Sequence, residues 1–388
     1  MITKPSYNPT FFLAALGPGG LSVSFFMYLM FVLPRDTENF PIPTFDTLLN
    51  VWNKWDMFFQ IVMIISILWI IFFAFKHFQM LLWNLNQFFA FKKTADYKKL
   101  KNSNWEISLM AMPLTLAMTV NVLFILWAVF IPWLWSVVEY LFPGALIAFL
   151  LVWILALSIF MDYFVRLILK HTDADFVNNN SLSQMLSVFA FVMVWVWFAA
   201  SAAMSNIKLT IFLWLVGSIF FITISVFLLL LKLTLWFKAI LEHGIDKAAS
   251  PSLWIIIPIL TLIWITFIRQ SHWLHDFWIH STDADYMVLT LIILSLQIFF
   301  WYLWYKVMKS NSYFIDFIDW KEKNPGSYAL ICPWVALTVF AFFFLHLWLV
   351  KNWLVDKFSI SYFLLLLPIL YVQIKTIIVM FKLNKKMF

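Results

Sequence analysis

The sequence predicts an all-α membrane protein with ten transmembrane helices, and three observations support that prediction. The 388 residues are 64% hydrophobic and only 12% charged, whereas a soluble domain has about 25% charged residues. The apolar residues gather in ten runs, each long enough to cross roughly 30 Å of hydrocarbon. Alternate runs contain a proline, which costs a helix interior about 3 kcal/mol. We therefore expect a single transmembrane domain over residues 1–388.

The lengths of the apolar runs place the ten spans along the chain. The predicted spans are 10–33, 57–75, 107–131, 138–160, 184–203, 209–231, 253–268, 286–307, 328–350 and 359–381. The second, fourth and sixth runs continue as amphipathic sequence, so these helices are expected to extend past the bilayer. After the first span, the odd-numbered spans begin roughly 75 residues apart, which predicts five helical hairpins that all start on one side.

Prolines in the odd-numbered spans indicate which helices surround a cavity. These prolines, with the glycine beside the first, are Pro18, Gly19, Pro113, Pro258 and Pro333. In hydrocarbon, a proline defect is tolerated mainly where the freed backbone groups face protein or a water-filled cavity. The fifth span has no proline, but the small residues at 199–203 suit close packing. We predict an inner ring of odd helices around a pore and an outer ring of even helices, with Pro368 in the tenth span as an exception to the alternation.

Basic residues predict the orientation. Most of the 26 lysines and arginines fall at the N-terminus, in the even-to-odd connections and at the C-terminus. The opposite face receives Arg35, Lys54, Lys208, Arg269, Lys351 and Lys357. By the positive-inside rule, both termini are expected in the cytoplasm, with the protein in a bacterial inner (plasma) membrane. Topology then explains the net charge of +7, so membrane lipid is an expected partner and nucleic acid is not.

Ionisable residues are scarce at membrane depth. Asp162 and Arg166 lie four residues apart near one end of the fourth span, and we expect them to form an ion pair. No deep carboxylate is expected for proton or sodium coupling, whereas kinked backbone and helix N-termini attract anions. Asn121 and Gln297 are the leading polar residues at depth. Each is expected to bond to a neighbouring helix, and Asn121 is also a pore candidate.

Two local patterns are similar to metal or acid–base sites but have simpler interpretations. His272, His275 and His280 gather in a tryptophan-rich loop typical of the membrane interface, without a His-Glu-x-x-His motif. Thr172–Asp175 and Thr282–Asp285 repeat one sequence, yet they fall on opposite faces of the predicted topology, and the second copy suits a helix N-cap. We therefore expect no metal, no cofactor and no enzymatic activity.

Short motifs in the odd spans are similar to those of the tellurite-resistance/dicarboxylate transporter family. That family includes TehA, yeast-type sulfite exporters and the slow anion channels of plant guard cells. The motifs here are Asn8–Phe12 with Gly17–Gly20, Pro113–Ala117, Pro258–Leu262 and Ala329–Trp334, and the resemblance covers most of the chain. It implies a five-helix pore within five outer helices, and a homotrimer with one pore per subunit. It also implies passive or weakly coupled passage of small anions, whether halide, nitrate, sulfur oxyanion or dicarboxylate.

The resemblance further implies a gate phenylalanine in the ninth span, directly before the proline. This chain has Cys332, its only cysteine, before Pro333, so Phe340 two turns further on is an alternative gate. Cys332 has three interpretations: a small apolar residue packed beside a kink, a pore-lining residue without chemistry, or a redox group. The redox interpretation would make the protein a membrane-embedded redox enzyme or sensor. An inactive, pore-occluded partner subunit is a further alternative.

Overall fold

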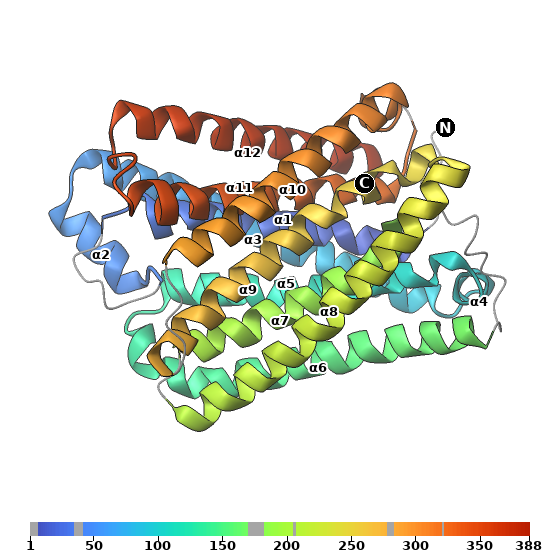
Figure 1. The fold of residues 1–388 in the computed structure, drawn as a ribbon, viewed down its shortest axis with the longest axis horizontal. Coiled ribbons are helices and arrows are strands. Elements are labelled where there is room, and N and C mark those ends of the chain that lie inside the picture. The colour runs from blue at the N-terminus through green and yellow to red at the C-terminus, as the bar shows by residue number, and fades with distance from the viewer. Residues whose placement is uncertain (1–6, 35–41, 170–181, 205–206, 278–282, 320–321) are drawn as a thin grey trace.

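The computed structural model describes residues 7–34, 42–169, 182–204, 207–277, 283–319 and 322–388. In these ranges the chain forms helices and no strand (Figure 1). Nine helices there are long and apolar enough to cross a membrane, and Ser183–Val196 is a shorter apolar helix. The predicted class is therefore confirmed, because a helical chain of this hydropathy is an integral membrane protein.

The long helices fall into two sets that alternate along the chain. The set we call the core helices is α1 (Leu13–Phe31), α5 (Ala111–Phe130), α7 (Leu186–Met204), α9 (Ile256–Phe277) and α11 (Ile331–Phe344). The set we call the peripheral helices is α3 (Met57–Phe91), α6 (Leu134–Ile168), α8 (Lys208–His243), α10 (Asp283–Ser310) and α12 (Ile360–Met387). In their most apolar stretches, α1 is 89% buried and α9 is 83% buried, whereas α6 is 17% and α3 is 33% buried. The remaining helical segments include α2 (Phe45–Lys54), α4 (Ala95–Lys101) and the π-helical Phe314–Asp319 and Leu345–Val350.

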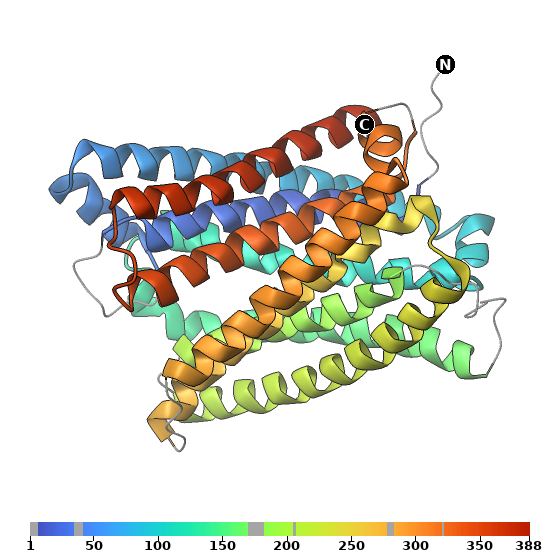
Figure 2. The same cartoon turned by 45° about the horizontal axis from the view of Figure 1, so that its top comes forward.

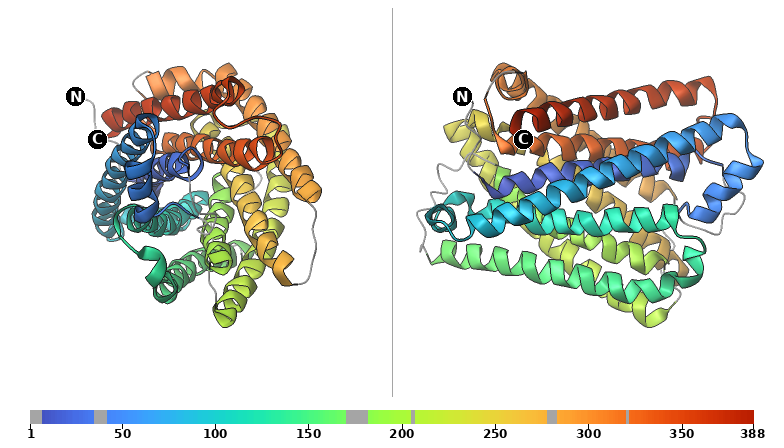
Figure 3. Two further views of the ribbon diagram at one scale, coloured as in Figure 1. Left: turned by 90° about the vertical axis from the view of Figure 1, so that its left-hand side faces the viewer. Right: turned by 180° about the vertical axis from the view of Figure 1, so that it is seen from behind.

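Each core helix packs against the next peripheral helix in the chain. The pairs are α1 with α3, α5 with α6, α7 with α8, α9 with α10 and α11 with α12. Core helices also touch one another: α1 contacts α5 and α11, α7 contacts α5 and α9, and α9 contacts α11. Figure 1 and Figure 2 show the long helices side by side, and Figure 3 (left) looks along them. The ring of Phe388 lies 5.8 Å from that of Phe11 and 4.7 Å from that of Trp83, so the C-terminus lies at the end where α1 starts.

Each core helix is preceded by a 3-10 segment. These segments are η1 (Pro9–Phe12), η2 (Asn104–Met110), η3 (Leu182–Met185), η4 (Lys247–Ile255) and η6 (Pro325–Leu330). Four of them share one cap, in which the side chain of Asn8, Ser103, Asp246 or Asn324 accepts a hydrogen bond from the backbone N–H two residues on. Such caps satisfy backbone donors that a helix start would otherwise leave exposed. The chain therefore uses one local solution at four separate helix starts.

The prolines of three core helices lie at the change from 3-10 to α-helix. Pro113, Pro258 and Pro333 are each the third residue of their α-helix, and each lies within an apolar span that also includes the preceding 3-10 segment. Where i→i+3 bonding gives way to i→i+4 bonding, one N–H is left without a carbonyl. Proline has no N–H, so it removes that unpaired donor. Pro18 differs, because it lies inside α1.

The peripheral helices α3, α6 and α8 continue well past the predicted span ends at 75, 160 and 231. The extension of α6 carries Asp162 and Arg166, and the predicted ion pair between them is wrong. Arg166 instead donates through Nε and Nη2 to Glu106, which is 2% exposed, while Asp162 lies 3.7 Å from Lys101. A buried carboxylate needs such a partner, because losing it leaves an uncompensated charge. The Arg166–Glu106 pair thus ties the start of α5 to α6.

A histidine from α3 enters the contact between α1 and α5. His77 Nδ1 lies 2.8 Å from the carbonyl oxygen of Ala15, and Nε2 lies 2.9 Å from Thr119 Oγ1. A carbonyl only accepts, so Nδ1 carries the proton and donates it to Ala15. A Cβ at Gly19 would lie 2.8 Å from His77 Nδ1 and 2.5 Å from Met118 Cγ. Position 19 therefore requires glycine for this close approach.

Replacing this glycine tests the three-helix contact. We expect Gly19→Ala to lower the unfolding temperature in detergent, at a cost of about 1–3 kcal/mol, because His77 and Met118 must move. Gly144→Ala on α6 is the matched control, since nothing lies within 4 Å of its added Cβ. That control should keep or slightly raise stability, as alanine is the better helix former. Equal unfolding temperatures for the two variants would contradict the packing described.

Candidate functional site

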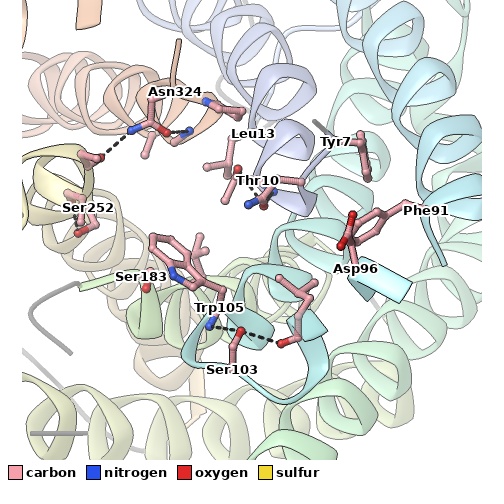
Figure 4. Close-up of a pocket in the computed structure, with 18 of the residues that line it drawn as sticks. Tyr7, Thr10, Leu13, Phe91, Asp96, Ser103, Trp105, Ser183, Ser252 and Asn324 are labelled. Atoms are coloured by element: carbon pink, nitrogen blue, oxygen red, sulfur yellow. Dashed lines mark hydrogen bonds between the residues drawn. The ribbon is translucent and has the colours of Figure 1, made fainter. Parts of the chain in front are cut away.

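Two cavities follow one another along the core helices. The larger, which we call the wide chamber, has a volume of about 820 Å³ and is lined where the 3-10 segments begin. Its lining includes Thr10, Ser103, Trp105, Ser183, Ser252 and Asn324, whose side chains surround the opening in Figure 4. The smaller, which we call the narrow chamber, has a volume of about 170 Å³ and is lined further along the same five helices. The two cavities thus occupy successive levels of one bundle.

The wide chamber has a polar lining in which most groups already have partners. Asn324 Nδ2 donates to the carbonyl of Ala248 at 2.7 Å, which joins the start of α11 to the start of α9. The Tyr7 hydroxyl donates to the backbone carbonyl of Asn84 at 3.3 Å, and burial raises the pKa of Tyr7, so the phenol stays neutral. The Lys99 ammonium lies 3.5 Å from the Asp96 carboxylate, so the two charges that α4 places in the lining offset each other. This chamber is the larger of the two, and the charged side chains in its described lining sum to zero.

The narrow chamber is apolar apart from a few side chains. Aromatic and aliphatic residues such as Phe26, Phe124 and Val339 form most of its wall. Arg269 is the single charged side chain among the described residues that line it. Its Nη1 donates to the carbonyl oxygen of Val196 on α7 at 2.9 Å. The chamber therefore combines an apolar wall with one positive charge and, in its described lining, no carboxylate.

The predicted seventh span ends at residue 268, which places Arg269 in an outer connection. In the structure α9 continues to Phe277, so Arg269 remains helical. It lies on one stripe of α9 with Pro258, Leu262 and Ile265, all of which line the narrow chamber. Intervals of three and four residues place these side chains on the same helix face. That spacing was the available sequence signal for Arg269.

The predicted site residues divide between the chamber wall and the surrounding core. Asn121, Pro258 and Cys332 line the narrow chamber. Pro18, Gly19, Pro113, Pro333 and Phe340 are absent from the lining of both chambers. Phe340 is fully buried with its ring 4.9 Å from that of Trp264. Asn121 Nδ2 also donates to the carbonyl of Ala117 at 3.3 Å and to Met193 Sδ at 3.7 Å, which confirms the expected bond to a neighbouring helix.

The predicted histidine cluster and acidic repeats yield no site geometry. The side chains of His272, His275, His280, Thr172–Asp175 and Thr282–Asp285 lie outside the described residues. Among the side chains that are described, no three histidines, cysteines or carboxylates gather in a way that would hold a metal ion. The candidate site is therefore built on the two chambers.

The large side chain at the boundary between the two chambers is a phenylalanine of α7. Leu186, Ile255 and Ala329 line the wide chamber, and the residues three positions on line the narrow one. Those residues are, in order, Phe189, Pro258 and Cys332. Phe189 is the aromatic member of this set and is 4% exposed. The sequence does not mark this position, because α7 has no proline.

Truncating Phe189 tests this boundary without reference to function. Cys332 is the only cysteine, so a small water-soluble methanethiosulfonate reports access to one site. We expect Phe189→Ala to speed modification of Cys332 about tenfold, because removing the ring opens the route between the chambers. Mass spectrometry of the reaction over time measures the rate, and Cys332→Ser gives the background.

Phe340→Ala is the matched control, because it removes the same ring from a site behind the chamber wall. It should cost about 3–5 kcal/mol of stability and leave the modification rate unchanged. Equal acceleration in the two variants, or in neither, would contradict the assignment of Phe189 to the boundary.

Comparison with known proteins leaves the site to be interpreted from its own geometry. No family model, no curated protein and no solved structure matches this chain. The resemblance to the tellurite-resistance/dicarboxylate transporter family accordingly remains a hypothesis based on short motifs. The function must be argued from the chambers and the charge that they contain.

Proposed function

We propose that this protein is a membrane channel or transporter for small anions, passive or weakly coupled. The anion would pass along the two chambers between the core helices. In this proposal α1, α5, α7, α9 and α11 form an inner ring, and each makes a hairpin with its peripheral helix. The contacts of α1 with α5 and α11, of α7 with α5 and α9, and of α9 with α11 support such a ring.

The observation that carries the proposal is Arg269 in the wall of the narrow chamber. Charged side chains at membrane depth are expensive and mark ion pathways. Charges interact more strongly in an apolar environment than in water, so one cation there attracts anions and repels cations. A guanidinium has five N–H donors, and its bond to Val196 uses one. The remaining donors suit an anion that has lost part of its water.

The polar rim of the wide chamber suits the capture of anions from solution. The starts of the core helices line it, and helix N-termini carry a partial positive charge. Asn8, Ser103 and Asn324 line this rim, and each side chain accepts a hydrogen bond from the backbone N–H two residues on. With both termini in the cytoplasm, as the basic residues predict, the wide chamber would open to the cytoplasm.

Halides, nitrate, sulfur oxyanions and dicarboxylates all remain candidate substrates for this site. The homotrimer implied by the resemblance is part of the proposal, as is lipid around the peripheral helices. A redox role for Cys332 is the competing function: it predicts thiol-dependent electron transfer that Cys332→Ser abolishes, without anion flux. Anion flux retained in Cys332→Ser would eliminate that alternative.

Substitution of Arg269 tests the proposed function. In proteoliposomes with the purified protein, we expect Arg269→Gln to lower chloride and nitrate flux about tenfold or more, because the attracting charge is gone. Arg269→Lys should retain part of the flux, because it keeps the charge and loses the planar donor array. Flux is measured by an anion-sensitive dye across a panel of anions.

Lys208→Gln is the matched control, because it removes an exposed basic residue that sequence analysis assigned to the same face as Arg269. It should leave flux within about twofold of the wild type, since water screens exposed charges. Equal flux through the wild type and Arg269→Gln, or loss of flux in the control as well, would contradict a role for Arg269 in conduction.

A further inference from the structure

A buried glutamine on a peripheral helix reaches the back of the narrow chamber wall. Gln297 of α10 is fully buried. Its Nε2 lies 2.8 Å from Thr261 Oγ1 and 3.4 Å from the carbonyl oxygen of Ile257 on α9. Only an amide nitrogen can donate to a carbonyl, so the contact with Ile257 fixes which way the amide faces. Thr261 itself lines the narrow chamber.

The amide oxygen of Gln297 makes no hydrogen bond. Gln297 Oε1 is among the buried side-chain atoms without a hydrogen-bond partner in the described part of the chain. Leaving such an atom unpaired destabilises the folded state, and an apolar side chain of similar size would avoid this penalty. The contribution of this side chain must therefore come from its N–H groups, which are directed at Thr261 and Ile257.

The Thr261 hydroxyl donates to a carbonyl oxygen that Gln297 also contacts. Its Oγ1 accepts from Gln297, so its own proton has to point elsewhere. The nearest acceptor is the Ile257 carbonyl at 3.0 Å, with that of Ala336 at 3.5 Å. The Ile257 carbonyl already faces the helical N–H four residues on and Gln297 Nε2. A carbonyl oxygen has two lone pairs, so the Thr261 hydroxyl shares this acceptor with two other donors.

We infer that Gln297 is a positioning residue that makes Thr261 a hydrogen-bond donor to the anion in the narrow chamber. The inference rests on the proposed function and specifies the recognition at that site. By donating to one lone pair of Thr261 Oγ1, Gln297 excludes the rotamers in which the hydroxyl proton would point toward α10. The proton then turns from Ile257 to the passing anion. The chamber thereby favours anions that accept a strong hydrogen bond over those that accept a weak one.

The test measures the ratio of chloride flux to thiocyanate flux in proteoliposomes, because chloride is the stronger hydrogen-bond acceptor. Thr261→Val keeps the side-chain shape without the hydroxyl, and we expect the ratio to fall about fivefold. Gln297→Met should lower the ratio in the same direction, and Gln297→Leu gives a second variant of different shape. The double variant Thr261→Val with Gln297→Met should match Thr261→Val alone, because Gln297 acts through Thr261. Thr261→Ser keeps the hydroxyl and should keep the ratio.

Gln373→Met is the matched control. Gln373 of α12 is an equally buried glutamine, bonded to Ser24 and Tyr28 at 2.8 Å each, and none of the three lines the narrow chamber. Its loss should leave the chloride-to-thiocyanate ratio unchanged. A Gln297 variant that lowers both fluxes equally, or that leaves the ratio intact, overturns the inference while anion conduction stands. Absence of any anion flux in the wild type overturns the proposed function and this inference together.

Discussion

The whole structure depends on one constraint: within hydrocarbon, every backbone N–H and C=O must find its partner inside the protein. The core helices meet it first at their starts, where capped 3-10 segments lead into α-helix. At three of these junctions a proline occupies the position whose backbone N–H would have no acceptor. Proline usually disrupts a helix, but at this position its missing N–H avoids an unpaired donor. With their starts satisfied in this way, the core helices can begin around the wide chamber.

Four of the peripheral helices, α3, α8, α10 and α12, bond to the core helices or to the segments before them through a polar side chain directed inward. His77 donates to a carbonyl of α1. Lys232 donates to the carbonyl of Gln184 in η3 at 2.9 Å and to Ser187 Oγ in α7 at 3.0 Å. Gln297 and Gln373 reach α9 and α1 in the same manner. Hydrogen bonds of this kind hold helices together in membranes, where hydrophobic association is weak. With only seven glycines in the chain, few contacts are close enough to depend on backbone approach, and Gly19 is the clearest of them.

Composition and hydropathy were enough to predict the helical membrane class, because helix is the form in which an apolar chain satisfies its own backbone. The positions of Pro113, Pro258 and Pro333 were known, but their role was not, since a 3-10 segment has no distinct hydrophobic period. Arg269 was misplaced because a charge normally marks the end of a span, and only the packed structure shows its side chain at the chamber wall. Glu106 and Phe189 had no local signal in the sequence. Glu106 matters because it pairs with Arg166 of α6, and Phe189 matters because it lies at the boundary between the chambers. Both roles depend on tertiary contacts.

The central claim is that a narrow apolar chamber with one arginine makes this bundle selective for anions. Its most direct test is the reversal potential of the purified wild-type protein in a planar bilayer, with different potassium chloride concentrations on the two sides. If the account is correct, current reverses near the equilibrium potential of chloride. Reversal near the equilibrium potential of potassium would contradict it, because a chamber whose described lining holds a guanidinium and no carboxylate cannot favour cations.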